Sequence, residues 1–161
     1  MKKPIKHLGI ILLLHLPVAA TAQVRYSDPA NRDRAKEIGT SMLETIKAKE
    51  RKWKLKLALV SEFGFHPYLN SGSQELDFSI YVYDSPEEAS KNLQFHSNAS
   101  SITAPSLLKD FGDEAYYMRH RYFTWIGVRK GRMLVEVHGP GPELTITRRI
   151  AEYGLEQLIE K

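Results

Sequence analysis

Cysteine is absent from the chain of 161 residues. A chain without cysteine has no disulfide bonds, no cysteine-ligated zinc or iron–sulfur cluster, and no thiol nucleophile. Long apolar runs are also scarce, since no stretch after residue 22 approaches the roughly 20 apolar residues that a membrane-spanning helix needs. The composition, 42% hydrophobic and 26% charged, is typical of a soluble folded domain, and the length favours one domain over two.

The first 22 residues have the features of a secretory signal peptide. Three lysines precede the apolar run Leu8–Leu16, and Ala20-Thr21-Ala22 is a small-x-small cleavage site. A retained membrane anchor is the alternative, but the apolar stretch Leu8–Ala20 has only 13 residues and contains a histidine and a proline. We therefore predict that residues 1–22 are removed, and that residues 23–161 form a single exported domain, periplasmic or secreted.

The formal charge of +4 comes mostly from this leader. The leader carries three lysines and no acid, so residues 23–161 hold 20 basic and 19 acidic side chains. A near-neutral domain gives little support to nucleic acid or an anionic membrane as a general partner. The charge is nevertheless uneven, because residues 57–118 hold two basic and nine acidic side chains while both flanking segments are basic.

The densest basic run is Lys47–Lys56, where six basic residues and one acid surround Trp53. One interpretation is a docking surface for an anion or polyanion. The other is the solvated surface of a helix end and a strand, on which Lys54 and Lys56 protect a sheet edge from pairing. We favour the second interpretation.

Capping signals and apolar spacing predict three helices. Asp28 and Pro29 begin a helix over residues 29–50, and Ser85-Pro86-Glu87-Glu88 begins a second helix that runs to Asn98. A third helix is expected near the end of the chain. Its apolar side carries Ile146, Ile150, Ala151, Leu155, Leu158 and Ile159.

Alternation of apolar and polar residues predicts the strands. They cover residues 53–59, 76–82, 115–119, 122–129 and 132–138, with loops over 61–74 and 99–110. The first strand is expected to have one wet face of lysines, and Lys130-Gly131 a tight turn. The predicted fold class is α+β, with an antiparallel sheet of about five strands and three helices in the order α-β-β-α-β-β-β-α.

Three segments carry a resemblance to known proteins. They are the element Gly112-Asp113-Glu114-Ala115-Tyr116, the hairpin Trp125–Val137, and the strand-to-helix passage Tyr81–Ala89. Residues 76–160 are similar to a loose group of small exported bacterial proteins and lipoproteins, some of which adopt a PsbP/Mog1-like sandwich. The resemblance implies a fold and an exported location, and it assigns no catalytic residue. The chain lacks the lipoprotein cysteine, which implies a form without a lipid anchor.

Four histidines follow the leader: His66, His96, His120 and His138. None of their spacings matches a His-Glu-x-x-His helix or another known metal motif. The favoured interpretation is four unrelated side chains. The alternative is a metal-dependent enzyme, which requires at least two of them to converge in the fold.

Other catalytic patterns are weak. Ser106-Leu107-Leu108-Lys109 has the Ser-x-x-Lys spacing of some acyltransferases but lacks their partner motifs, and Gly-x-Ser-x-Gly is absent. Asp113-Glu114 forms either a paired-carboxylate site or part of a turn. In the favoured turn, Gly112 bends the chain, Asp113 accepts from a local amide, and Glu114 is solvated.

Aromatic residues gather at the end of the strand predicted over 76–82 and in a later stretch over residues 116–125. They are Tyr81, Tyr83, Tyr116, Tyr117, Tyr122, Phe123 and Trp125. Exposed on a sheet face they would suit a binding surface, whereas under helices they would be core, which we favour.

These observations favour a non-catalytic binding or interaction domain in the bacterial envelope. We assign no catalytic residue, cofactor or metal, and expect the partner to be a protein, an envelope component or a small ligand. The first alternative is a small periplasmic hydrolase or metal-dependent enzyme. The second is a structural subunit of an envelope assembly that pairs through an edge strand.

Overall fold

The computed structural model describes residues 28–99, 104–142 and 144–158. The predicted signal peptide and its cleavage site lie outside these residues. The helices are α1 (Pro29–Lys49), α2 (Pro86–Asn98) and α3 (Leu144–Gln157). The strands are β1 (Lys54–Val60), β2 (Phe65–Ser71), β3 (Gln74–Val82), β4 (Ser106–Leu107), β5 (Glu114–Arg119), β6 (Phe123–Lys130) and β7 (Met133–Pro140).

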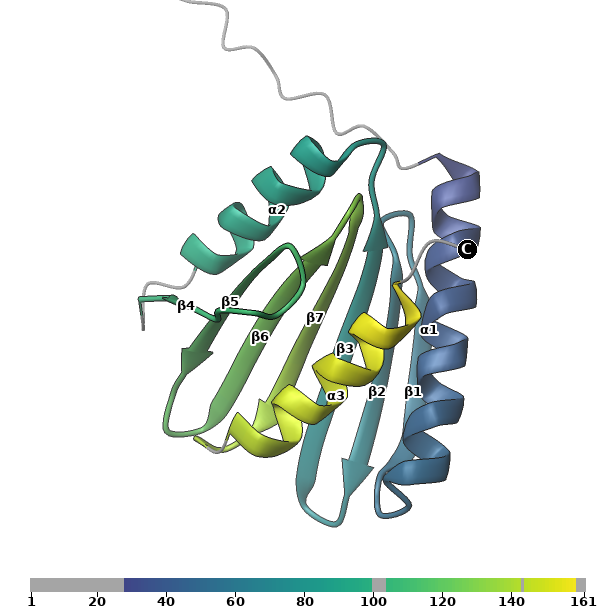
Figure 1. Cartoon of the computed structure of the whole chain (residues 1–161). Helices are drawn as coiled ribbons and strands as arrows, with labels where there is room; N and C mark the ends of the chain where they lie inside the picture. Colours follow the sequence, from purple (N-terminus) through teal and green to yellow (C-terminus); the bar gives the residue numbers. More distant parts are fainter. Residues whose placement is uncertain (1–27, 100–103, 143, 159–161) are drawn as a thin grey trace, which may run out of the picture.

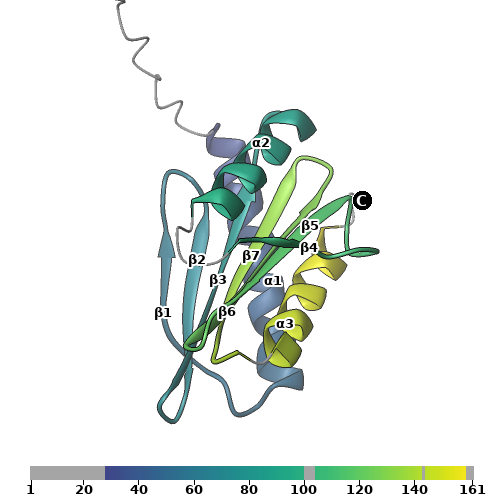
Figure 2. The same cartoon turned by 90° about the vertical axis from the view of Figure 1, so that its left-hand side faces the viewer.

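The strands form one antiparallel sheet in the order β1-β2-β3-β7-β6-β5-β4. Helices α1 and α3 pack together on one face, and α2 crosses the other face near one end (Figures 1 and 2). The α+β class, the three helices and the antiparallel sheet were therefore predicted correctly. The strand count was wrong, because the described residues form seven strands in the order α-β-β-β-α-β-β-β-β-α.

Strand β2 lies within residues 61–74, which the sequence pattern predicted to be a loop. Pro67, Asn70 and Ser71 indicated a loop, yet they lie in a strand between β1 and β3. Pro67 has no N–H to donate, and the β2–β3 pairing is interrupted beside it between Phe65 and Tyr68. The second missed strand, β4, is only two residues long and pairs with β5.

The predicted helix starts are confirmed by their caps. Asp28 accepts a hydrogen bond from the amide of Ala30 at the start of α1. Ser85 accepts from the amide of Glu88 at the start of α2, as a capping box requires. The return bond differs from expectation, since the Glu88 carboxylate accepts from the amide of Asp84 and not from that of Ser85.

The main core lies between the sheet and the pair α1–α3. Alternate residues of β3 and β7, among them Phe78, Ile80 and Val135, are fully buried there against Met42 of α1. Helix α1 approaches the sheet closely at Gly39, where a Cβ atom would overlap the ring of Phe65. Within the described ranges, no helix combines the length and the apolar character needed to cross a membrane.

Strand β1 is an edge strand, and all seven of its residues are exposed. The expected single wet face is wrong, because residues on both sides of the strand are exposed. A bulge at Lys56 also interrupts the alternation. Leu55 is opposite Leu69, whose side chain is buried on the α1 side, whereas Leu57 is opposite exposed Tyr68 on the other face. The strand therefore shows apolar side chains on both faces of the sheet.

Candidate functional site

The sheet face opposite α1 and α3 is only partly covered. Helix α2 packs over β5, β6 and β7 and leaves the β1–β3 side without a helix (Figure 2). We call the uncovered part the open face. Its side chains are those of Leu57, Leu59, His66, Tyr68, Asp77, Ser79 and His138.

His66 is held between two serine hydroxyls on this face. Its Nε2 lies 2.8 Å from Ser61 Oγ, and its Nδ1 lies 2.9 Å from Ser79 Oγ. Burial lowers the pKa of His66, although the charges of Glu136 and Asp77 oppose that shift. The ring is therefore neutral near pH 7, and it can accept from one hydroxyl while donating to the other.

Ser61 does not have the geometry of a free nucleophile. Its Oγ also accepts hydrogen bonds from the amides of Phe63, at 3.2 Å, and Gly64, at 3.1 Å. These bonds shape the turn between β1 and β2 in the manner of a serine turn. The Ser61–His66 hydrogen bond therefore positions the imidazole ring. The amides of Phe63 and Gly64 already donate to Ser61 and are not free to bind another oxygen.

His96 reaches the same region from α2. Its Nδ1 lies 2.7 Å from Oε1 of Glu136, a β7 residue with an exposed fraction of only 5%. This hydrogen bond raises the pKa of His96 against the opposing effect of burial. The ring of Tyr81 lies between His96 and His66, with ring centroids 5.9 Å and 5.5 Å away. Burial, followed by the charge of Glu136, raises the pKa of Tyr81 and keeps its hydroxyl protonated.

His138 completes the polar part of the open face. Its Nδ1 lies 3.0 Å from Oδ1 of Asp77 on the neighbouring strand β3. Burial lowers the pKa of His138, but the hydrogen bond and charge of Asp77 outweigh it, so the net shift is upward. The side chain stays 44% exposed, so this pair is open to a ligand.

An apolar groove adjoins the His138–Asp77 pair. It has a volume of about 370 Å³, and Leu57, Leu59 and Tyr68 line it together with Asp77. These three apolar side chains have exposed fractions of 41% to 49%. The open face thus combines hydrogen-bonded polar side chains at its centre with exposed apolar side chains near the edge strand.

The fold brings three of the four histidines together. His66, His96 and His138 gather around Tyr81, Glu136 and Asp77, whereas His120 lies at the β5–β6 turn against the rings of Tyr122 and Phe123. In residues 28–99, 104–142 and 144–158, no group of three or more His, Asp and Glu side chains is arranged to hold a metal ion.

Comparison of the sequence with protein-family models and with curated proteins found no match. The interpretation of the open face therefore depends on its own geometry.

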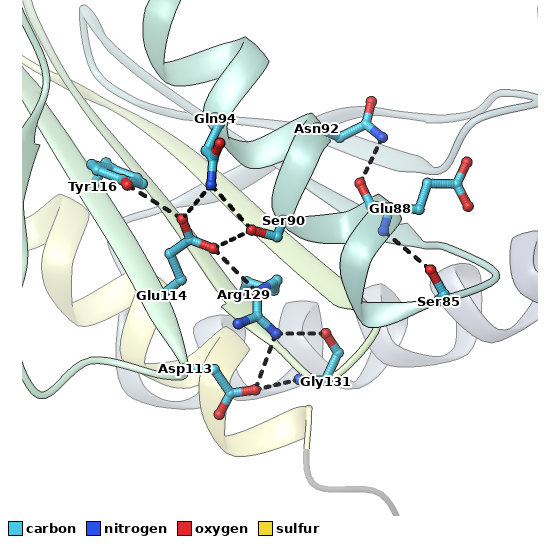
Figure 3. A network of polar contacts seen from close by, with 10 residues as sticks. All are labelled: Ser85, Glu88, Ser90, Asn92, Gln94, Asp113, Glu114, Tyr116, Arg129 and Gly131. Atoms are coloured by element: carbon cyan, nitrogen blue, oxygen red, sulfur yellow. Dashed lines mark hydrogen bonds and ion pairs between the residues drawn. The ribbon is translucent and has the colours of Figure 1, made fainter.

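Asp113 and Glu114 form a structural network instead of a shared-proton site (Figure 3). Asp113, in the loop before β5, accepts from the amide of Gly131 in the β6–β7 turn at 2.7 Å. That hydrogen bond, with the side chains of Lys130 and Arg129, lowers the pKa of Asp113. The expected turn role is correct in kind, but the amide lies on another hairpin and is not local.

Glu114 is not solvated as expected. Its carboxylate accepts from the Ser90 hydroxyl at 2.6 Å and the Gln94 amide at 3.1 Å, both on α2, and from the Tyr116 hydroxyl at 3.2 Å (Figure 3). Burial raises the pKa of Glu114, but these bonds and the Arg129 guanidinium outweigh it and lower the pKa overall. The network fastens α2 to the sheet.

Most of the aromatic residues are packed under α2. Trp125 is 2% exposed and forms a small core with Leu93, Met118 and Leu134. Further rings pack around this core; they are Tyr81, Tyr83, Tyr116 and Phe123. Tyr117 packs on the main core, and Tyr122 is 66% exposed.

The basic run is divided among local contacts. Trp53 is buried, Lys47 pairs with Glu44, and Lys56 pairs with Glu75. Lys52 and Trp53 border a hollow of about 480 Å³ beside α3. The buried Glu50 in this hollow accepts hydrogen bonds from Arg149 at 2.9 Å and from Tyr153 at 3.2 Å. The charges of Glu50 and Arg149 therefore neutralise each other.

The remaining motif, Ser106-x-x-Lys109, starts on the short exposed strand β4. Sequence reasoning missed Ser79, Asp77 and Glu136 as members of the site. The alternation of Asp77, Ser79 and Tyr81 along β3 was the available signal, since period-two spacing puts all three on one face.

Proposed function

We propose that this protein is an exported, non-catalytic binding domain that holds an amphipathic ligand on its open face. The observation that carries the proposal is the unequal cover of the sheet: α1 and α3 pack together on one face, whereas α2 packs on the other face over β5, β6 and β7 and leaves the β1–β3 side without a helix. The leader-like residues 1–22 and the resemblance to small exported bacterial proteins support a location in the bacterial envelope.

The polar groups of the open face are held in place before a ligand arrives. His138 is fixed by Asp77, and His66 is fixed by Ser61 and Ser79. Pre-positioned donors and acceptors reduce the entropy that binding costs. An adjoining groove of exposed leucine and tyrosine side chains adds apolar contact area. This combination suits a ligand with a polar end and an apolar body.

A dye-binding experiment tests the proposal. Anilinonaphthalene sulfonate has an anionic group and an apolar ring system, so it mimics such a ligand. We expect the Tyr68→Ala and His138→Ala variants each to weaken saturable dye binding at least about fivefold, since each loses a contact worth about 1 kcal/mol. Tyr122→Ala is the matched control, because Tyr122 is an exposed tyrosine of the β5–β6 turn that does not line the groove.

Equal dye binding by the three variants would contradict the proposal.

A separate measurement tests the hydrolase alternative. Covalent labelling of Ser61 by a fluorophosphonate, with loss of labelling in His66→Asn, would overturn the non-catalytic assignment, because only an activated serine reacts at such a rate.

A further inference from the structure

The two edges of the sheet differ in their capacity to pair with another chain. Strand β4 has two residues, whereas β1 has seven, and all seven are exposed. Among the described strands, β1 pairs only with β2, so its outer backbone groups face away from the sheet. An exposed edge of this length is a template for a further strand.

The lysines of β1 protect this edge less than expected. Lys56 lies at the bulge, and its Nζ lies 3.1 Å from Oε1 of Glu75 on the same molecule. Its charge is therefore compensated within the chain. From Leu57 to Val60 the strand carries no charge, and its leucine and valine side chains have exposed fractions of 45% to 50%.

We propose that β1 is the interface of a homodimer in which two copies pair edge to edge in antiparallel register. A two-fold axis beside Ala58 places Leu57 opposite Leu59 of the second copy. Both residues lie on the open face, so the register keeps each side chain on its own side of the sheet. Lys56 then lies opposite Val60 of the second copy, and no lysine is opposite another lysine.

The geometry favours a second copy as the occupant. A head-to-tail assembly would need a long strand at each edge, and β4 is too short to receive β1. Pairing of β1 with itself is isologous and closes after two copies. The four leucines would then form one cluster on the open side of a continuous sheet.

The size of the contact predicts its strength. Four to five paired residues form an interface at the low end of specific contacts, below about 1,200 Å² in total. We therefore expect a dissociation constant in the micromolar range. The two open faces would lie on the same side of the dimer, with their apolar grooves next to each other across the two-fold axis.

The absence of cysteine permits a direct test of the register. Ala58→Cys introduces a single thiol beside the proposed axis, where paired Cα atoms in an antiparallel sheet lie about 4.5–5.5 Å apart, within the range of a disulfide. We expect oxidised glutathione to convert this variant to a covalent dimer at least about tenfold faster than Leu107→Cys. Leu107 is the control because it is exposed on the opposite edge.

Sedimentation of the unmodified chain from about 1 µM to about 1 mM measures the association itself. We expect a reversible monomer–dimer equilibrium that Leu59→Lys weakens at least tenfold, while Leu107→Lys leaves it unchanged. A monomer at all concentrations would overturn the proposal. So would cross-linking of Ala58→Cys no faster than the control, or a dimer that Leu59→Lys does not weaken.

Discussion

At the scale of single residues, His96 and His66 respond to acid in opposite ways although both lie beside Tyr81. The hydrogen bond that His96 donates to Glu136 raises the pKa of His96, so its contribution to stability is complete below pH 6.5 and is lost as the pH rises through the folded-state pKa. Burial lowers the pKa of His66, so its contribution is present above pH 6.5 and is lost as the pH falls.

We therefore expect His96→Gln to reduce the free energy of unfolding by about 2 kcal/mol at pH 5.5, and by less at pH 9, because a charge-assisted bond to a buried carboxylate is lost. His66→Asn should show the reverse dependence, with its larger loss at pH 9. Urea unfolding at the two pH values measures both. A loss that does not vary with pH in either variant would show that the rings contribute through packing alone.

At the scale of the elements, α2 covers only part of its sheet face and depends on polar contacts to stay there. Glu114 at the start of β5 joins Ser90 and Gln94 of α2 to Arg129 of β6 (Figure 3). The His96–Glu136 bond adds an attachment near the C-terminal end of the helix. The boundary of the open face is therefore set by these two attachments as well as by Leu93.

Removing the first attachment tests this account. We expect Glu114→Ala to lower the free energy of unfolding by about 2–3 kcal/mol, because several donors lose a partly buried acceptor. Glu37→Ala, which removes an exposed ion pair with Arg34 on α1, should cost under about 0.5 kcal/mol. Equal losses in chemical denaturation would mean that Glu114 is a surface charge like Glu37.

The elements that sequence could predict are those with local signals. Ser85 and Pro86 marked the start of α2, and the alternation of apolar residues marked β3. Strand β2 was missed because Pro67 and the polar residues after it are typical of loops, and only pairing with β1 and β3 makes them a strand.

At the scale of the whole molecule, the candidate site arises from contacts that no local pattern records. The hydrogen bond between His66 and Ser79 forms because β2 and β3 are neighbours in the sheet. The hydrogen bond between His96 and Glu136 depends on where α2 crosses the sheet. The histidines were visible in the sequence, but which three would gather was not. His120 illustrates this, since it lies close to His138 in sequence but belongs to a different region.

The central claim is that the open face binds ligands, and mapping the dye by NMR tests it most directly. Anilinonaphthalene sulfonate is added to the ¹⁵N-labelled chain until the amide shifts saturate. We predict that the shifted amides belong to β1, β2, β3 and His138, while those of α1 and α3 stay unchanged. Saturable shifts confined to the hollow between Lys52 and Arg149, or no saturable shifts at all, would contradict the account.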